Sequence, residues 1–462
     1  MRVVHVVPNV SEEASGPAYS VPSLARALGR GGDDVALLSV LGRPLPAAPG
    51  FTHHVYPRAL ILPRLWRSPA LARALAREAQ RADVVHSHSL WVMPNIYPGW
   101  VARPAATRLV VSPRGTLSPW ALNHSRYKKK LVWALLQGRV VRAAACLHAT
   151  AEDEYRDLRA LGLRQPVCII PNGVDVPARA ARDEETEVAS APRMLLYIGR
   201  LHVKKGIDRL LRAWTALAPT RPDWCLWIVG PDDGGHEREL RELAASLRTP
   251  RVTFAGPVYG DAKRQLYRRA AIHVLPSHSE NFGMTVAESL ASGTPVIATR
   301  ATPWSGLERE ACGYWIELGV EPLLAALREA TSRGRVELSS LGARGRAWME
   351  RDFSWDRVGR EMAAVYPGCT PEARCRRACA STERASRRRL CVRAADGVNL
   401  RQGCPLRAYR AKALPARPRP PRGPRRWRAR ACSPSAPPVP IAAATPACIA
   451  SARSSRSAPR SR

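Results

Sequence analysis

One stretch, residues 272–299, constrains the fold of this chain more than any other. It contains two short apolar runs, at 272–276 and 295–298, which are bounded by Pro or Gly and which predict buried strands. Between them the sequence predicts a helix over about residues 282–291, with Asn281 or a neighbour as its N-cap. Two buried strands joined through one helix indicate an α/β fold.

Two carboxylates stand around the start of this helix. Glu280 and Glu288 are eight residues apart, which at about 100° per residue places them about 80° apart on a helix and excludes a single acid/base pair. We expect Glu280 on the incoming loop and Glu288 inside the helix. The free N–H groups near Gly283, Met284 and Thr285 predict an anion site. A carboxylate suits a diol, so a nucleoside diphosphate sugar fits this pattern.

The order of these residues resembles that of a known family. Glu280, Glu288 and the following 293–297 turn and strand resemble the E-x7-E signature of the retaining glycosyltransferases of family 4, which have the GT-B fold. The resemblance covers roughly residues 1–366 and is strongest over 194–300. It implies an α/β protein with two Rossmann-like domains that face a central cleft.

The resemblance divides the chain into four parts. Residues 1–176 are expected to form the N-terminal, acceptor-side Rossmann-like domain, and residues 177–192 a linker. Residues 193–366 are expected to form the C-terminal nucleotide-sugar donor domain, whose last helix crosses back to the first domain. Residues 367–462 are rich in Arg, Pro, Ala, Ser and Cys and lack a sustained hydrophobic period, so we expect a disordered basic tail.

The tail holds much of the excess charge. The chain has 72 Lys and Arg against 38 Asp and Glu, a formal charge of +34, and residues 367–462 hold 23 of the basic and 3 of the acidic residues. Two interpretations are open: an ending translated out of frame, or a polybasic anchor to a membrane or to nucleic acid. Nucleic-acid binding is suggested only by net charge, and it is not expected, because most of the excess lies in this tail, which lacks aromatic stacking motifs.

The expected donor domain begins with a strand that ends at Gly199 and Arg200, followed by a short loop that contains Lys205. In the family, this Arg and this Lys face the donor diphosphate. Fixed cations meet the growing charge of a diphosphate leaving group, and the sequence has no Asp-x-Asp metal motif. The resemblance therefore implies a metal-independent reaction without a cofactor, with Glu280, Arg200 and Lys205 as the catalytic residues.

Two positions of the N-terminal domain depart from the family. Relatives usually carry a Gly pair in the first loop, and this chain has Gly16 alone, which fits either a donor contact or a plain turn. Many relatives carry His-Gly at a later strand end, where this chain has Arg114. Arg114 either contacts the donor sugar or its phosphate, or forms a structural ion pair.

The resemblance gives roles to the residues of the donor site. Glu288 would bind the ribose diol, and Glu280 with the backbone of Phe282 and Gly283 would hold the transferred sugar. The full predicted donor set is Gly16, Arg114, Gly199, Arg200, Lys205, Phe282, Gly283, Met284, Thr285 and Glu288.

His86 and His88 stand at the end of another predicted strand, where open α/β sheets bind ligands. The period of a strand places both imidazoles on one side. Each is either a polar wall of the acceptor pocket or a hydrogen-bonded structural histidine. No further His, Cys or carboxylate joins them at metal-ligand spacing, so no metal site is expected.

Other features bear on location. No run approaches the 18 to 20 or so apolar residues of a membrane-spanning helix, and the four cysteines before the tail show no paired spacing. Residues 126–136 form a basic amphipathic stretch, which is either a solvated helix face or a docking site for anionic lipid. We expect a cytoplasmic protein, with a peripheral place on the inner face of the membrane as a further possibility.

Taken together, the sequence predicts a retaining glycosyltransferase that moves a sugar from a nucleoside diphosphate sugar to a hydroxyl. The family's habits suggest a lipid-linked or saccharide acceptor in surface polysaccharide or glycolipid synthesis. Two alternatives belong to other classes: a GT-B nucleotide-sugar epimerase, and a polyanion-binding protein that acts through its basic tail.

Overall fold

The structure is a computed structural model that describes residues 1–10, 16–40, 42–60, 63–102, 107–177 and 192–368. Nearly all of the predicted linker and of the predicted tail therefore lies outside the described residues. Within the described part of the chain, no helix combines the length and the apolar character needed to cross a bilayer.

The first domain is built on a parallel sheet in the order β3-β2-β1-β4-β5-β6-β7. Its interior strands carry continuous apolar runs, because both faces of a parallel sheet are covered. The strands are β1 (Arg2–Val7), β2 (Asp34–Val40), β3 (Phe51–Tyr56), β4 (Val84–His88), β5 (Arg108–Ser112), β6 (Cys146–Ala149) and β7 (Val167–Ile169).

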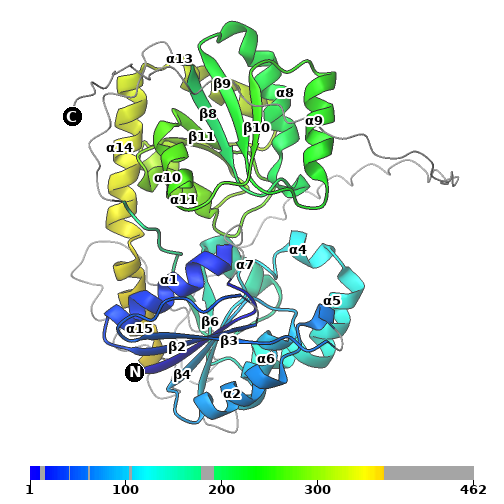
Figure 1. The fold of residues 1–462 in the computed structure, drawn as a ribbon, viewed down its shortest axis with the longest axis vertical. Coiled ribbons are helices and arrows are strands. Elements are labelled where there is room, and N and C mark those ends of the chain that lie inside the picture. The colour runs from blue at the N-terminus through cyan, green and yellow to red at the C-terminus, as the bar shows by residue number, and fades with distance from the viewer. Residues whose placement is uncertain (11–15, 41, 61–62, 103–106, 178–191, 369–462) are drawn as a thin grey trace, which may run out of the picture. The chain divides into compact units, whose positions relative to one another are not determined.

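Helices cover both faces of this sheet (Figure 1). On one face, Val4 and Val6 pack against apolar residues of α2, α3 and α6, and on the other Val3 and Val7 pack against α1 and α15. The helices are α1 (Gly16–Arg30), α2 (Pro69–Ala79), α3 (Tyr97–Ala102), α4 (Pro119–Asn123), α5 (Arg126–Val132), α6 (Gly138–Arg142), α7 (Glu152–Ala160) and α15 (Trp355–Gly368), with short turns at Pro63–Leu65 and Met93–Asn95 and a π-helical turn at Trp133–Gln137.

The last described helix, α15, belongs to the core of the first domain although it lies at the far end of the sequence. Trp355, Val358 and Met362 are buried in one apolar cluster with Val3 of β1 and Val84 of β4. Arg30 at the end of α1 forms an ion pair of 2.7 Å with Asp356. Figure 1 shows α15 beside α1.

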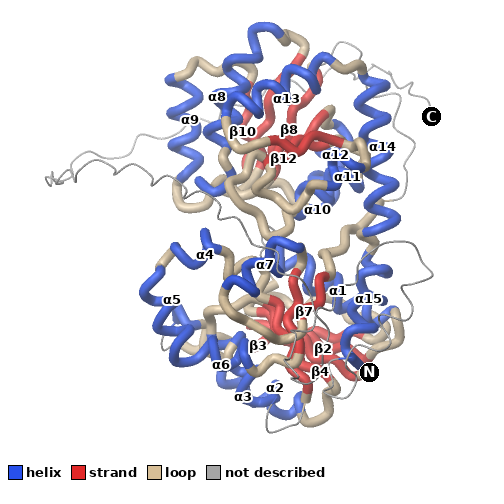
Figure 2. The backbone as a smooth tube through the Cα atoms, turned by 180° about the vertical axis from the view of Figure 1, so that it is seen from behind, coloured by secondary structure: helices blue, strands red, loops and turns tan. Residues whose placement is uncertain are grey.

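The second domain has a parallel sheet in the order β10-β9-β8-β11-β12-β13. Figure 2 shows these strands in red with helices around them. The strands are β8 (Arg193–Ile198), β9 (Trp224–Val229), β10 (Val252–Gly256), β11 (Ile272–Leu275), β12 (Val296–Thr299) and β13 (Gly313–Ile316). The helices are α8 (Ile207–Leu217), α9 (His236–Ser246), α10 (Gly260–Arg269), α11 (Met284–Ala291), α12 (Gly306–Arg309), α13 (Val320–Ser332) and α14 (Arg335–Asp352), with 3-10 turns at Val203–Lys205 and Ala218–Thr220.

The helix between β11 and β12 starts later than the sequence predicts. Gly283, not Asn281, is the N-cap of α11, with a φ of 81° that favours glycine. A Cβ at Gly283 would lie 3.2 Å from Nε1 of Trp304. The Asn281 amide donates instead to Oγ1 of Thr150, at 2.7 Å. The predicted start was wrong because Phe282 turns into the core, which leaves Gly283 to bend the chain.

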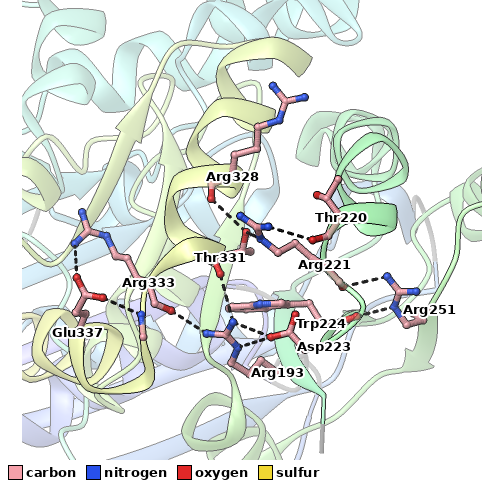
Figure 3. Close-up of polar contacts among 11 residues, drawn as sticks. Arg193, Thr220, Arg221, Asp223, Trp224, Arg251, Arg328, Thr331, Arg333 and Glu337 are labelled. Carbon is pink, nitrogen blue, oxygen red and sulfur yellow. Dashed lines mark hydrogen bonds and ion pairs between the residues drawn. The ribbon is translucent and has the colours of Figure 1, made fainter.

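Five arginines lie together in the second domain, near the amino ends of its strands (Figure 3). We call Arg193, Arg221, Arg251, Arg328 and Arg333 the arginine cluster. Arg193 donates to the carbonyl oxygens of Arg333 and Thr331, which end α13, at 2.8 and 3.4 Å. Arg251 donates to the carbonyls of Trp224, Ala218 and Arg221 at 2.9, 2.5 and 3.1 Å. Cations at helix C-termini satisfy orphan carbonyls and complement the helix dipole.

We predict that Arg251→Ala lowers the free energy of unfolding by about 2 kcal/mol, because charged hydrogen bonds to three carbonyls are lost. Urea unfolding followed by tryptophan fluorescence measures the loss. Arg212→Ala, which removes an exposed arginine from α8, is the matched control and should change stability little. Equal losses in the two variants would show that the carbonyl contacts of Arg251 contribute no stability.

Candidate active site

A hollow opens at the carboxyl ends of β8 and β9 and at the start of α11. It contains about 530 Å³ of empty space, part of it open to solvent. Its walls combine backbone, aromatic and charged groups. The lining residues are Gly16, Tyr19, Ile198, Gly199, Arg200, Gly230, Pro231, Val258, Tyr259, Lys263, Met284, Thr285 and Glu288.

The two strand ends approach each other closely at the edge of the hollow. A Cβ at Gly230 would lie 1.8 Å from the carbonyl oxygen of Gly199, so no larger residue fits there. Gly230 also has a φ of 149°. Both glycines line the hollow at the carboxyl ends of their strands, where α/β sheets usually bind ligands.

Lys205 and Glu280 form an ion pair on the loops that follow β8 and β11. The Lys205 ammonium donates to Glu280 Oε1 at 2.6 Å, and the Ser277 hydroxyl donates to the same oxygen at 2.6 Å. The Lys205 and Glu280 side chains are 16% and 10% exposed. Burial would raise the pKa of Glu280, but the charge and hydrogen bond of Lys205 outweigh it and hold that pKa below its usual value. Glu280 is therefore an anion.

Glu288 lies on α11 and is held from α10. Lys263 forms an ion pair with its Oε2 at 2.6 Å, and the Tyr267 hydroxyl donates to the same oxygen at 2.9 Å. Burial raises the pKa of Tyr267 well above its usual value, so the phenol stays a donor. With both donors on Oε2, the other oxygen of Glu288 has lone pairs for hydroxyl groups of a ligand.

Arg200 also has a carboxylate partner. Its Nη1 donates to Asp233 Oδ2 at 2.6 Å, and the two side chains are 50% and 36% exposed. An exposed pair of this kind contributes little stability and exchanges partners readily. An incoming anion at the hollow therefore competes with Asp233 for Arg200.

The start of α11 supplies a further positive feature. The N–H groups of Met284 and Thr285 are the first two of the helix and have no partner inside it. Met284 and Thr285 line the hollow together with Arg200. A helix N-terminus beside a cation favours phosphate oxygens.

The structure brings some predicted donor residues together and leaves others apart. Six predicted residues line the hollow: Gly16, Gly199, Arg200, Met284, Thr285 and Glu288. Phe282 is 5% exposed and packs against Trp304, whose indole donates to the Phe282 carbonyl at 2.5 Å. That carbonyl is thus already occupied. Any backbone contact of Phe282 and Gly283 with a sugar is therefore expected from their N–H groups. Lys205 and Glu280 are not among the residues that line the hollow.

Arg114 is buried, 8% exposed, at the end of β5. It donates to the side-chain oxygen of Asn172, and its Nη2 lies 3.2 Å from Nδ1 of His88. Burial lowers the pKa of Arg114 to about 10. Its partners among the described residues are neutral side chains, so the structural ion pair that the sequence left open is not formed there. A contact of Arg114 with the donor stays a prediction.

His86 and His88 lie on the sheet face that α15 covers, and both are fully buried. Nδ1 of His86 lies 3.0 Å from the Tyr366 hydroxyl of α15. Nε2 of His88 lies 2.8 Å from Nδ1 of His5 on β1. These positions agree with the structural interpretation of the two histidines, and an acceptor contact for them stays a prediction.

His5 overturns one argument made from spacing. The sequence showed no third ligand near His86 and His88, but β1 pairs with β4 and places His5 directly beside His86, so that the three rings offer nitrogens within 4.8 Å of one another. The group fits a cation poorly. The Arg114 guanidinium adjoins His88, so a bound cation would meet a second positive charge at short range.

The sequence analysis missed the residues that hold the two glutamates. Lys263 and Tyr267 are four residues apart on α10 and therefore share one face of the helix. That spacing was visible in the sequence, although its partner Glu288 was not. Asp233 left no such signal, because its partner Arg200 lies on another loop. Ser277 lies only three residues before Glu280 on the same loop, but a loop has no periodicity that would have paired the two side chains.

Buried histidines predict that the fold is sensitive to acid. Burial lowers the pKa of His148 on β6 and of His273 on β11 to about 3, below the ordinary 6.5. Their neutral forms therefore stabilise the fold above pH 6.5, and this contribution is lost as the pH falls from 6.5 towards 3. We expect the urea unfolding free energy to fall over that range.

The variant His273→Gln tests this. Its curve of unfolding free energy against pH should be shallower than that of the wild type by about 1.4 kcal/mol per pH unit below pH 6. Curves of equal slope would show that His273 does not cause the acid sensitivity.

We further predict that Asp233→Asn strengthens nucleotide binding about two- to fivefold, because the diphosphate no longer competes for Arg200. Calorimetric titration with nucleoside diphosphates measures the dissociation constant. Asp223→Asn changes the charge equally but frees Arg193, in the arginine cluster. The same gain in both variants would indicate a general charge effect and contradict the competition.

Two sequence families match the chain. The profile described as "Glycosyl transferases group 1" matches residues 179–341, and the one described as "Glycosyl transferase 4-like domain" matches residues 15–173. The D-inositol 3-phosphate glycosyltransferase of Geodermatophilus obscurus is 31% identical over 325 residues, which are 65% of this chain and 70% of that protein. The glycogen synthase of Mycobacterium tuberculosis is 29% identical over 62% of this chain and 69% of its own length.

Solved structures agree in fold. The sucrose-phosphate synthase of Thermosynechococcus elongatus has a TM-score of 0.60 at 21% identity, covering 79% of this chain and 98% of its own. Anabaena HepE, solved with UDP-glucose, has a TM-score of 0.63 at 17% identity, covering 80% and 100%. With its two parallel-sheet Rossmann-like domains, the chain therefore belongs to the family 4 type of GT-B glycosyltransferases and is an enzyme of that class.

Proposed function

We propose that this glycosyltransferase transfers a sugar from a nucleoside diphosphate sugar to a hydroxyl group with retention of anomeric configuration. One observation supports this above all. Arg200, Glu288 and the first two residues of α11, Met284 and Thr285, line a single hollow. Cation and amides suit a diphosphate, and the carboxylate suits a ribose diol.

The diphosphate is expected to take over the cations of the site. Arg200 would exchange Asp233 for a phosphate oxygen, while Lys205 stays beside Glu280 and faces the second phosphate. As the bond to the sugar breaks, charge grows on the leaving diphosphate. Positive groups that are already in place stabilise that charge without reorganisation.

The nucleoside is expected to lie along the wall opposite these cations. Oε1 of Glu288 would accept from the ribose hydroxyls, because Lys263 and Tyr267 occupy Oε2. Val258 and Tyr259 line the same hollow and would border the base. Backbone groups near Tyr259 would then read the edge of the base.

The transfer step needs no nucleophile from the protein. The acceptor oxygen forms a bond to the anomeric carbon on the face from which the diphosphate leaves, and the acceptor proton passes to an oxygen of that diphosphate. The ionised Glu280 would orient the hydroxyls of the transferred sugar with its second oxygen. Retention follows because the new bond forms on the face that the old bond occupied.

The relatives suggest the class of donor and of acceptor. Anabaena HepE was solved with UDP-glucose, and other relatives are named as inositol-phosphate glycosyltransferases. For this chain we propose a nucleoside diphosphate hexose as donor and a lipid-linked or saccharide hydroxyl as acceptor, in surface polysaccharide or glycolipid synthesis. The place of action would be the cytoplasm at the inner face of an anionic membrane.

The test is a thermal-shift and hydrolysis screen of the full chain with UDP-, GDP- and ADP-sugars, with and without EDTA. One nucleotide class is expected to raise the melting temperature without metal, and Lys205→Ala and Glu288→Ala are each expected to lose that shift. Lys128→Ala and Glu242→Ala change exposed residues of α5 and α9 and should keep it.

The outcomes separate the candidate functions. A folded protein that no nucleotide stabilises would contradict the donor site. Conversion of the donor to an isomeric nucleotide sugar without any acceptor would identify an epimerase. Analysis of the product anomer by NMR decides between retention and inversion.

A further inference from the structure

An exposed apolar stripe runs along α5 and the π-helical turn that follows it in the first domain. Tyr127, Leu131 and Leu135 are 83%, 61% and 58% exposed, and Trp120 on α4 is 42% exposed. The first three are spaced by four residues, so they lie along one side of a helix. Exposed leucines and aromatic residues on one continuous face indicate a site of contact with something apolar.

Cations flank this stripe. Arg126, Lys128 and Lys130 are exposed, and none forms an ion pair with another described residue. The sequence from 84 to 151 contains no Asp or Glu at all. Many arginines of the second domain, by contrast, have a carboxylate partner within the same helix or on the next one. Positive potential at α5 is thus left without neutralisation.

A second hollow lies behind the stripe, with about 410 Å³ of open space. Its lining includes the apolar side chains of Trp91, Leu122 and Trp133 and the cation Lys129. The Lys129 ammonium is 5.6 Å from the Trp91 ring and donates to the Ala121 carbonyl. A hollow lined by both apolar and cationic side chains suits an amphiphile that has a negative head.

We propose that α4, α5 and the π-helical turn form a docking surface for an anionic phospholipid bilayer. Leu131, Leu135 and Tyr127 would enter the interface, while Arg126, Lys128 and Lys130 contact phosphate headgroups. A bilayer uses both halves of this surface. A nucleic acid would use the cations but leave the leucines in water, and a second copy would bring equal charges together.

The proposal deepens the membrane location given under the proposed function, but docking itself requires no sugar transfer. It names the surface that meets the membrane. The basic residues of 367–462 also attract anionic vesicles, so the experiment must separate the two contributions within the full chain.

The test is co-sedimentation of the full chain with vesicles of phosphatidylglycerol and phosphatidylcholine, at near-physiological salt. A cation near an anionic surface changes binding about fivefold. The pair Lys128→Glu and Lys130→Glu is therefore expected to weaken binding more than tenfold. Arg212→Glu and Arg328→Glu make the same change of net charge on exposed residues of the second domain, and they should weaken it far less.

The apolar half of the surface has its own pair. Leu131→Ser and Leu135→Ser should weaken vesicle binding at unchanged net charge, whereas Leu318→Ser and Val336→Ser, which are also exposed, should not. Equal binding by test and control pairs would overturn the proposal and assign vesicle binding to 367–462. Loss of DNA binding without loss of vesicle binding in the charge variant would identify a nucleic-acid surface instead.

The nucleotide thermal shift of each variant keeps the two proposals apart. The surface variants leave Arg200, Lys205 and Glu288 in place, so a normal shift with weak vesicle binding supports the docking surface. If the wild-type protein does not bind anionic vesicles but its melting temperature rises with a nucleotide, the docking surface is contradicted and the donor site is still supported.

Discussion

Ion pairs between the cations and carboxylates of the site are the interaction on which the rest depends. Lys205 and Glu280 are both mostly buried, and either one alone would be an uncompensated charge. Lys263, on the neighbouring helix α10, compensates the charge of Glu288 in the same way. The site therefore keeps its charged groups in place before a ligand arrives, which is what stabilisation of a charged transition state requires.

In each carboxylate of the site, the two oxygens have different roles. One oxygen of Glu280 and one of Glu288 accept two protein donors each, and the second oxygen of each has none of these donors. The protein thus fixes the plane of the carboxylate and leaves one edge for hydroxyl groups. Arg200 is different, because its exposed partner Asp233 can be displaced. The site thus combines two carboxylates that protein donors hold in place with one cation that can exchange its partner.

The sequence was sufficient for local features and for the resemblance, but not for contacts between distant segments. Apolar runs predicted β11 and β12, and the Gly-Arg string predicted Gly199 and Arg200 at a strand end. The spacing of residues along the chain does not reveal which strands are neighbours in the sheet. The sequence therefore did not show that His5 lies beside His86. Nor did it reveal that Phe282 faces the core, since a loop residue has no periodicity to follow.

The place of α15 has a consequence for synthesis on the ribosome. Trp355, Val358, Met362 and Tyr366 complete the apolar cluster on one face of the first sheet, and that sheet is translated long before them. Until they emerge, α1 covers part of that face, and the buried His86 lacks the contact that Tyr366 supplies. The second domain, which lies between in the sequence, can gather its own core first. The half of the enzyme that is made first is therefore the half that is finished last.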